Sequence, residues 1–146
     1  MTPTLAAFLD RHGFAPDRLS ALHADRRFTP LMRACKEGRL DVVDELLALG
    51  ADSSVLNADG CNALWLACYN GSHAIIERLL AAGIAIDLQN GNGATCLMYA
   101  ASNGKPDLVA LLLARGANPM LQNFDDFSAL DLAASVACLK LLRQAA

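Results

Sequence analysis

The sequence predicts an all-α solenoid built from stacked helix-turn-helix units, and three observations carry that prediction. The 146-residue chain repeats every 33 residues, the spacing from Gly38 to Gly71 and from Gly71 to Gly104. Other columns keep the period: Leu31, Leu64, Leu97 and Leu130; Ala34, Ala67, Ala100 and Ala133; Gly50, Gly83 and Gly116; Asn57, Asn90 and Asn123. Within each repeat, an apolar stripe at helical spacing follows a first short apolar segment. A fixed period of this length is typical of stacked repeats.

The first 23 residues do not follow the repeat. Leu5, Phe8 and Leu9 have the i, i+3, i+4 spacing of a short amphipathic helix, which we expect to end near Gly13. Pro16 is placed to open a second helical turn. A solenoid must cover its first apolar face, so we interpret this segment as a helical N-terminal cap. A flexible tail is the alternative.

Each repeat is expected to contain a hairpin turn, a short helix, a second turn and a longer helix. The short helices begin after residues that make good N-caps, namely Thr29, Asn62, Thr95 and Ser128. They should end near Gly38, Gly71 and Gly104, and the second helices should begin near Asp41, Ala74 and Asp107. Gly50, Gly83 and Gly116 then suit the left-handed residue that follows a helix.

The last unit is shorter than the others, because four residues and the inter-helix glycine are missing after Ala133. Terminal repeats are often atypical because one of their faces meets water. The predicted organisation is therefore a cap, three full repeats and a truncated C-terminal repeat. These occupy residues 1–23, 24–56, 57–89, 90–122 and 123–146.

Three aligned stretches carry a resemblance to a known family. They read TPLMRACKEGRLDVVDELLALGA, NALWLACYNGSHAIIERLLAAGI and TCLMYAASNGKPDLVALLLARGA. The pattern resembles the ankyrin repeat over about residues 24–146, and it implies an ankyrin-repeat solenoid. The family's histidine after TPL, which ties neighbouring turns together, is replaced by Met32, Trp65, Met98 and Asp131. We expect Trp65 to pack between repeats, in one ladder with Met32 and Met98.

Composition limits the class of protein. No apolar run approaches the ~20 residues of a membrane span, and the N-terminus lacks the basic start of a signal peptide. We therefore expect a cytoplasmic protein that contacts no membrane. The net charge of −3 argues against a nucleic-acid binder. We expect a monomer, and no cofactor.

The five cysteines are odd in number, and no two have the spacing of a zinc site. Cys35 and Cys68 hold equivalent places one repeat apart, where later repeats have Ala101 and Ala134. We interpret them as small apolar fillers. A metal or redox site built from Cys61, Cys96 and nearby aspartates is the alternative.

No catalytic motif is recognised. The chain has no P-loop, and the glycine-rich turn at Gly91–Gly93 follows no predicted strand. Asp125, Asp126 and Asp131 fit a solvated turn better than a cation site. We therefore expect neither catalytic nor metal-binding residues, and the chain is not expected to be an enzyme.

The resemblance implies a protein-binding module that holds its partner, whose identity the sequence does not give, on the concave face of the stack. In this family the exposed, variable places are the hairpin residues and those before each inter-helix glycine. Here they are Arg26, Phe28, Lys36, Glu37, Asp59, Cys61, Tyr69, Asn70, Asn92, Ser102, Asn103, Phe124, Asp125 and Phe127. For Phe28 and Phe127, packing against the caps is an equal alternative.

Tyr69 shares its column with Lys36 and Ser102, so we expect it to bind a partner and not to join the core. Residues 1–36 hold six basic and three acidic side chains, whereas the rest of the chain holds six and twelve. Such polarity would orient a charged partner. A self-associating structural protein is a further alternative.

Overall fold

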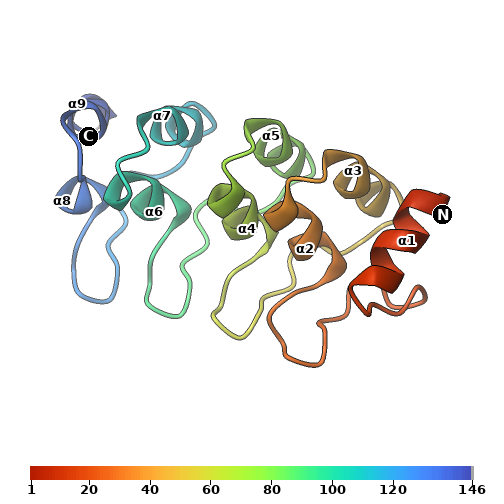
Figure 1. Ribbon diagram of the computed structural model, residues 1–146. Coiled ribbons are helices and arrows are strands. Elements are labelled where there is room, and N and C mark those ends of the chain that lie inside the picture. The colour runs from red at the N-terminus through yellow and green to blue at the C-terminus, as the bar shows by residue number, and fades with distance from the viewer. Residues whose placement is uncertain (146) are drawn as a thin grey trace. The chain divides into compact units, whose positions relative to one another are not determined.

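The chain folds into nine short helices over residues 1–145, the part that the computed structural model describes; the last residue of the truncated repeat predicted at 123–146 lies outside it. Figure 1 labels these helices along the ribbon. The helices are α1 Pro3–Arg11, α2 Pro30–Glu37, α3 Leu40–Ala48, α4 Ala63–Asn70, α5 His73–Ala81, α6 Cys96–Ser102, α7 Pro106–Ala114, α8 Ala129–Leu132 and α9 Val136–Ala145. The all-α solenoid fold predicted from the sequence is confirmed.

The starts of the short helices are set by side-chain caps. Thr29, Asn62, Thr95 and Ser128 each accept a hydrogen bond from a backbone N–H three residues later. Such a bond satisfies one of the N–H groups that the first turn of a helix leaves without a partner. At the other end, Gly38 and Gly71 adopt the left-handed conformation, with φ of 71° and 83°. The four predicted N-caps are confirmed by these hydrogen bonds, and the predicted helix ends near Gly38 and Gly71 are confirmed by the left-handed glycines.

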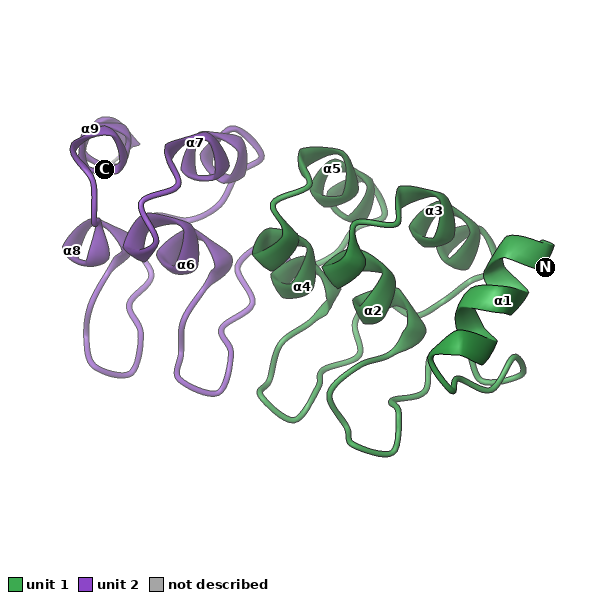
Figure 2. Ribbon diagram, in the orientation of Figure 1, with its two compact units in different colours: residues 1–84 green, residues 85–146 purple. Residues whose placement is uncertain are grey.

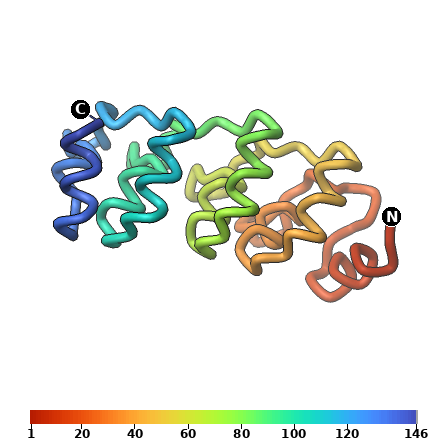
Figure 3. Tube along the Cα trace, turned by 90° about the horizontal axis from the view of Figure 1, so that it is seen from above, coloured from red at the N-terminus to blue at the C-terminus, as the bar shows by residue number. Residues whose placement is uncertain are grey.

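The chain divides into two compact units, residues 1–84 and the residues from 85 onward, each described here by itself (Figure 2). In unit 1, α2 packs beside α4 and α3 packs beside α5, so the short helices form one layer and the longer helices a second. Seen from above, the two helices of each pair lie side by side (Figure 3). Leu46, Leu64 and Ile76 are among the fully buried side chains of this unit.

The N-terminal helix covers the start of unit 1. Helix α1 packs against α3 and buries Leu5, Phe8 and Leu9. The Glu45 carboxylate in α3 accepts hydrogen bonds from the Thr2 N–H at 2.6 Å and from the Thr2 hydroxyl at 2.5 Å. The helix predicted to end near Gly13 is confirmed.

The prediction of a helical turn after Pro16 is wrong. Residues 15–21 form two successive turns, closed by hydrogen bonds from Arg18 N–H to Ala15 O and from Ala21 N–H to Arg18 O. The second turn starts where the first ends, so no ladder of helical hydrogen bonds forms.

Unit 2 repeats the two-layer arrangement, with α6 beside α8 and α7 beside α9. Its core includes Leu97, Val109 and Leu112. Helix α8 has only four residues and ends before Ala133, whose φ of −58° and ψ of 120° are not helical. Ala133 is half-buried, whereas Ala100 is fully buried. The alanine of this repeat position is therefore less buried in the shortened repeat than in the full repeat before it.

Candidate partner-binding surface

The hairpins of unit 1 are held by the side chain of Asn57. Its Oδ1 accepts hydrogen bonds from the backbone N–H groups of Asp59 and Cys61, each at 3.0 Å. Its Nδ2 donates to the carbonyl of Arg27 at 3.1 Å, and the Ala58 N–H donates to the carbonyl of Arg26 at 3.0 Å. One side chain therefore closes its own hairpin and joins it to the preceding one.

The hairpins of unit 2 are joined in a similar way. Asn90 and Asn123 each accept two backbone hydrogen bonds within their own hairpins. Gln89 Nε2 donates to the carbonyls of Gly93 at 2.9 Å and Gln122 at 2.8 Å. These amide side chains supply contacts between turns in a chain that lacks the family's histidine. The repeat pattern held a signal for Gln89, because Gln122 has the equivalent place one repeat later.

The exposed side chains of unit 1 gather at its hairpins and at the ends of its short helices. Of the candidates predicted there, six are exposed: Arg26, Lys36, Glu37, Asp59, Tyr69 and Asn70. Tyr69 is 44% exposed, whereas Trp65, one turn earlier in α4, is 3% exposed. The two rings lie 6.0 Å apart between centroids. The buried position expected for Trp65 is confirmed, and Tyr69 lies outside the core as expected.

Asn70 also fixes the surface around it. Its Nδ2 donates to the carbonyl of Lys36 at 3.1 Å, which joins the ends of α4 and α2. A Cβ at Gly38 would lie 3.0 Å from that nitrogen, so the glycine leaves room for the contact. Asn70 therefore has a structural contact in addition to its predicted role in binding.

Two candidates are buried, and their predicted place on the surface is wrong. Cys61 is 3% exposed, because it lies directly before the buried N-cap Asn62 and closes the hairpin with Asn57. Phe28, one repeat earlier in the same column, is 9% exposed and lines a cavity with Phe14 and His23. The alternative of packing against the cap is thus the correct one for Phe28.

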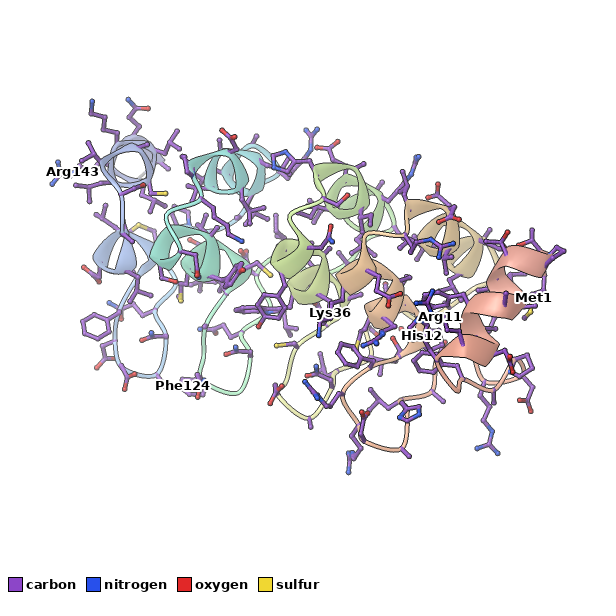
Figure 4. All side chains as sticks on the ribbon, in the orientation of Figure 1. Met1, Arg11, His12, Lys36, Phe124 and Arg143 are labelled. Carbon is purple, nitrogen blue, oxygen red and sulfur yellow. The ribbon has the colours of Figure 1, made fainter. Side chains whose placement is uncertain are left out.

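In unit 2, all six predicted candidates are exposed: Asn92, Ser102, Asn103, Phe124, Asp125 and Phe127. Phe124 is 72% exposed and Phe127 49%. Figure 4 shows Phe124 at the tip of a hairpin. Its backbone N–H donates to the carbonyl of Asn92 at 3.1 Å, and a Cβ on Gly93 would approach its ring within 2.6 Å. The tip of this hairpin, residues 124–127, thus presents two phenylalanines on either side of two aspartates, and a hydrogen bond fixes its backbone to the preceding hairpin.

All five cysteines are buried free thiols, and for Cys35 and Cys68 this agrees with the interpretation as small apolar fillers. Burial, with the neighbouring Cys68, raises the pKa of the Cys35 thiol far above its ordinary value. A thiol with a raised pKa is a poor nucleophile and a poor metal ligand. Among residues 1–145, no group of three or more His, Cys, Asp or Glu side chains could hold a metal ion.

The family is established by comparison with known protein families. A family model that describes three copies of the ankyrin repeat matches residues 5–90, 31–123 and 64–145. The chain therefore belongs to the ankyrin-repeat family, whose members are generally non-enzymatic modules for protein–protein interaction. A search of curated proteins found none that matches the chain. Among residues 1–145, no helix is both long enough and apolar enough to span a bilayer.

Proposed function

We propose that this protein binds a partner protein through the exposed side chains of its hairpin tips and short helices, on the concave face typical of the family. One observation carries the proposal: exposed aromatic rings stand on backbones fixed by hydrogen bonds. Tyr69 and Phe124 are exposed, and the segments around them are tied through Asn70 and through the Phe124 N–H. Aromatic side chains bury much area for few rotatable bonds, so they often anchor interfaces.

A pre-formed surface also lowers the cost of binding, because few groups must be ordered when the partner arrives. The alternation of charged and aromatic residues agrees with this use. Lys36 holds the place of Tyr69 one repeat earlier, and Asp125 and Asp126 separate Phe124 from Phe127. We further propose that the protein acts as a monomer in the cytoplasm and catalyses no reaction. Light scattering over a range of concentrations tests the monomer.

The binding proposal is tested by affinity capture from cells of the source organism. Immobilised wild-type protein and the Tyr69→Ala, Phe124→Ala and Leu49→Ala variants are compared, and retained proteins are identified by mass spectrometry. Leu49 is the matched control, because it is an exposed apolar residue after α3 and lies outside the proposed surface. We expect a protein that is retained by wild type and by the control but depleted with Tyr69→Ala or Phe124→Ala. Equal retention by all four proteins would contradict the proposal.

A further inference from the structure

A basic cluster surrounds one aromatic ring in unit 1. The Phe28 ring has the Arg27 guanidinium carbon 5.6 Å from its centroid, the Arg33 guanidinium carbon at 5.1 Å and the Lys36 Nζ at 5.0 Å. The face of an aromatic ring attracts cations, so Phe28 draws these three groups together. Their like charges repel one another. The cluster therefore favours an added anion.

The carboxylates near the cluster neutralise it only in part. Glu37 contacts His12, with Oε2 to Nε2 at 3.1 Å, and lies 3.6 Å from Arg33 Nε. Asp25 lies 3.5 Å from His23 Nδ1. The backbone N–H of Arg27 donates a hydrogen bond to Asp25 Oδ1 at 3.0 Å. This bond, together with His23, holds the pKa of the Asp25 carboxyl below its ordinary value.

Glu37 is thus shared between His12 and Arg33, and Asp25 between His23 and Arg27. Two carboxylates face three cationic side chains, so the cluster keeps a net positive charge. Within residues 1–145, neither Arg27 nor Lys36 forms an ion pair, and Arg33 Nε has no hydrogen-bond partner. Buried donors without partners are uncommon in folded proteins, so Glu37 at 3.6 Å does not fully satisfy the Arg33 side chain.

A cavity of about 210 Å³ opens beside this cluster. Its walls come from the N-terminal segment, through His12, Phe14 and His23, and from the first hairpin and α2. Figure 4 shows His12 and Lys36 on separate elements of this region of unit 1. The lining combines the side chains of two arginines, two histidines and two phenylalanines with one carboxylate, that of Asp25. Arginine binds carboxylate and phosphate through paired N–H donors, so this lining suits a planar or tetrahedral anion on a side chain.

We propose that this cavity binds an anionic side-chain group of the partner, either a carboxylate or a phosphate monoester, between Arg27, Arg33 and the Phe28 ring. The proposal rests on the proposed function, because it assigns part of the same surface. Three candidates of that surface, Arg26, Lys36 and Glu37, lie within four residues of the lining residues Arg27 and Arg33. It specifies the partner as an acidic or phosphorylated peptide segment. The excess of basic residues before position 37 supports this choice.

The test uses the isolated ¹⁵N-labelled protein, with phenyl phosphate and phenylacetate as probes and neutral phenylacetamide as control. We expect one or both anions to shift the amide resonances of Arg27, Phe28 and Arg33, and added salt to weaken the effect by screening. A response to phenyl phosphate alone would support the phosphate source, and a response to phenylacetate alone the carboxylate source. No shift near the cavity with either anion, or an equal shift with phenylacetamide, would overturn the proposal.

Variants locate the effect. In Arg27→Gln/Lys36→Gln, the affinity for the responding anion should fall at least about five-fold, because two of the three cations of the cluster are lost. In Lys140→Gln/Arg143→Gln, which removes the same charge from the exposed surface of α9, it should stay within about two-fold. Equal losses in the two variants would contradict the site. If the anions bind but no partner is captured, the anion site is supported and the proposed function is refuted. If a Tyr69-dependent partner is captured but no anion binds, the proposed function is supported and the anion site is refuted.

Discussion

The Asn57 side chain donates a hydrogen bond to the backbone carbonyl of Arg27 at 3.1 Å and thereby joins two successive hairpins of unit 1. The same side chain accepts two backbone hydrogen bonds within its own hairpin. A proposed binding surface made of hairpin tips depends on such ties, because exposed loops otherwise open at little cost in free energy.

We expect Asn57→Ala to lower the free energy of unfolding by about 1–3 kcal/mol, because three hydrogen bonds are lost and two backbone donors lose their acceptor. Chemical denaturation measures the change. Asp59→Ala is the control, since Asp59 lies in the same hairpin and its carboxylate makes no hydrogen bond within residues 1–145. It should change stability by less than about 0.5 kcal/mol. Similar effects of the two substitutions would show that the side chain of Asn57 is not the tie.

Asp126 occupies a left-handed conformation, with φ of 66°, where the two preceding hairpins have Gly60 and Gly93. A residue with a Cβ pays a steric cost there, although aspartate pays less than most. We expect Asp126→Gly to raise the free energy of unfolding by roughly 0.5–1 kcal/mol, after the entropy cost of glycine is included.

Its neighbour provides the control. Asp125 does not have a positive φ, so Asp125→Gly should be neutral or destabilising by a few tenths of a kcal/mol. Thermal unfolding of the two variants side by side makes the comparison. Stabilisation by Asp125→Gly and not by Asp126→Gly would contradict the assignment of strain to position 126.

Most of the helical framework was predictable because its signals are local. Thr29 and Asn62 cap helices through atoms three residues away, and Gly38 ends a helix by its own conformation. The basic cluster was predictable only as a charge excess, because the approach of His12 to Glu37 depends on how the N-terminal segment packs.

Burial at the hairpins was harder to predict than the helices. Phe28, Cys61, Ala94 and Phe127 share one column, yet Phe127 is exposed and Cys61 is buried. Side-chain burial there depends on which residues lie against the hairpin, and the period of a repeat carries no information about that.

Cys35 should make stability depend on pH in the alkaline range. Its thiol pKa is raised in the folded protein, so the unfolded chain releases this proton at lower pH than the native protein does. The contribution of the neutral thiol to the free energy of unfolding is complete below the ordinary pKa of 9.0, and it is lost as the pH rises above that value. We expect Cys35→Ala to weaken the fall in stability between neutral and alkaline pH, by up to about 1.4 kcal/mol per pH unit.

Denaturation of wild type and Cys35→Ala at matched pH values isolates this contribution, because the two proteins differ in sequence only at this residue. At neutral pH the variant should show only a modest loss of stability, since alanine leaves a small void. Parallel pH profiles for the two proteins would mean that the Cys35 thiol ionises as readily in the folded protein as in the unfolded chain.

Trp65 and Tyr69 stand one turn apart in α4 and should respond in opposite ways to truncation. Trp65 is buried, so Trp65→Ala should cost about 3–5 kcal/mol of stability. Tyr69 is 44% exposed, and Tyr69→Ala should lower the free energy of unfolding by at most about 1 kcal/mol, mainly through its ring contact with Trp65.

Tyr69→Ala should also weaken binding to the captured partner by roughly 1–2 kcal/mol or more, because aromatic side chains often anchor interfaces. Calorimetric titration of the folded variant and denaturant unfolding measure the two quantities separately. Large destabilisation with unchanged affinity of the folded fraction would show that Tyr69 is structural and that the partner binds elsewhere.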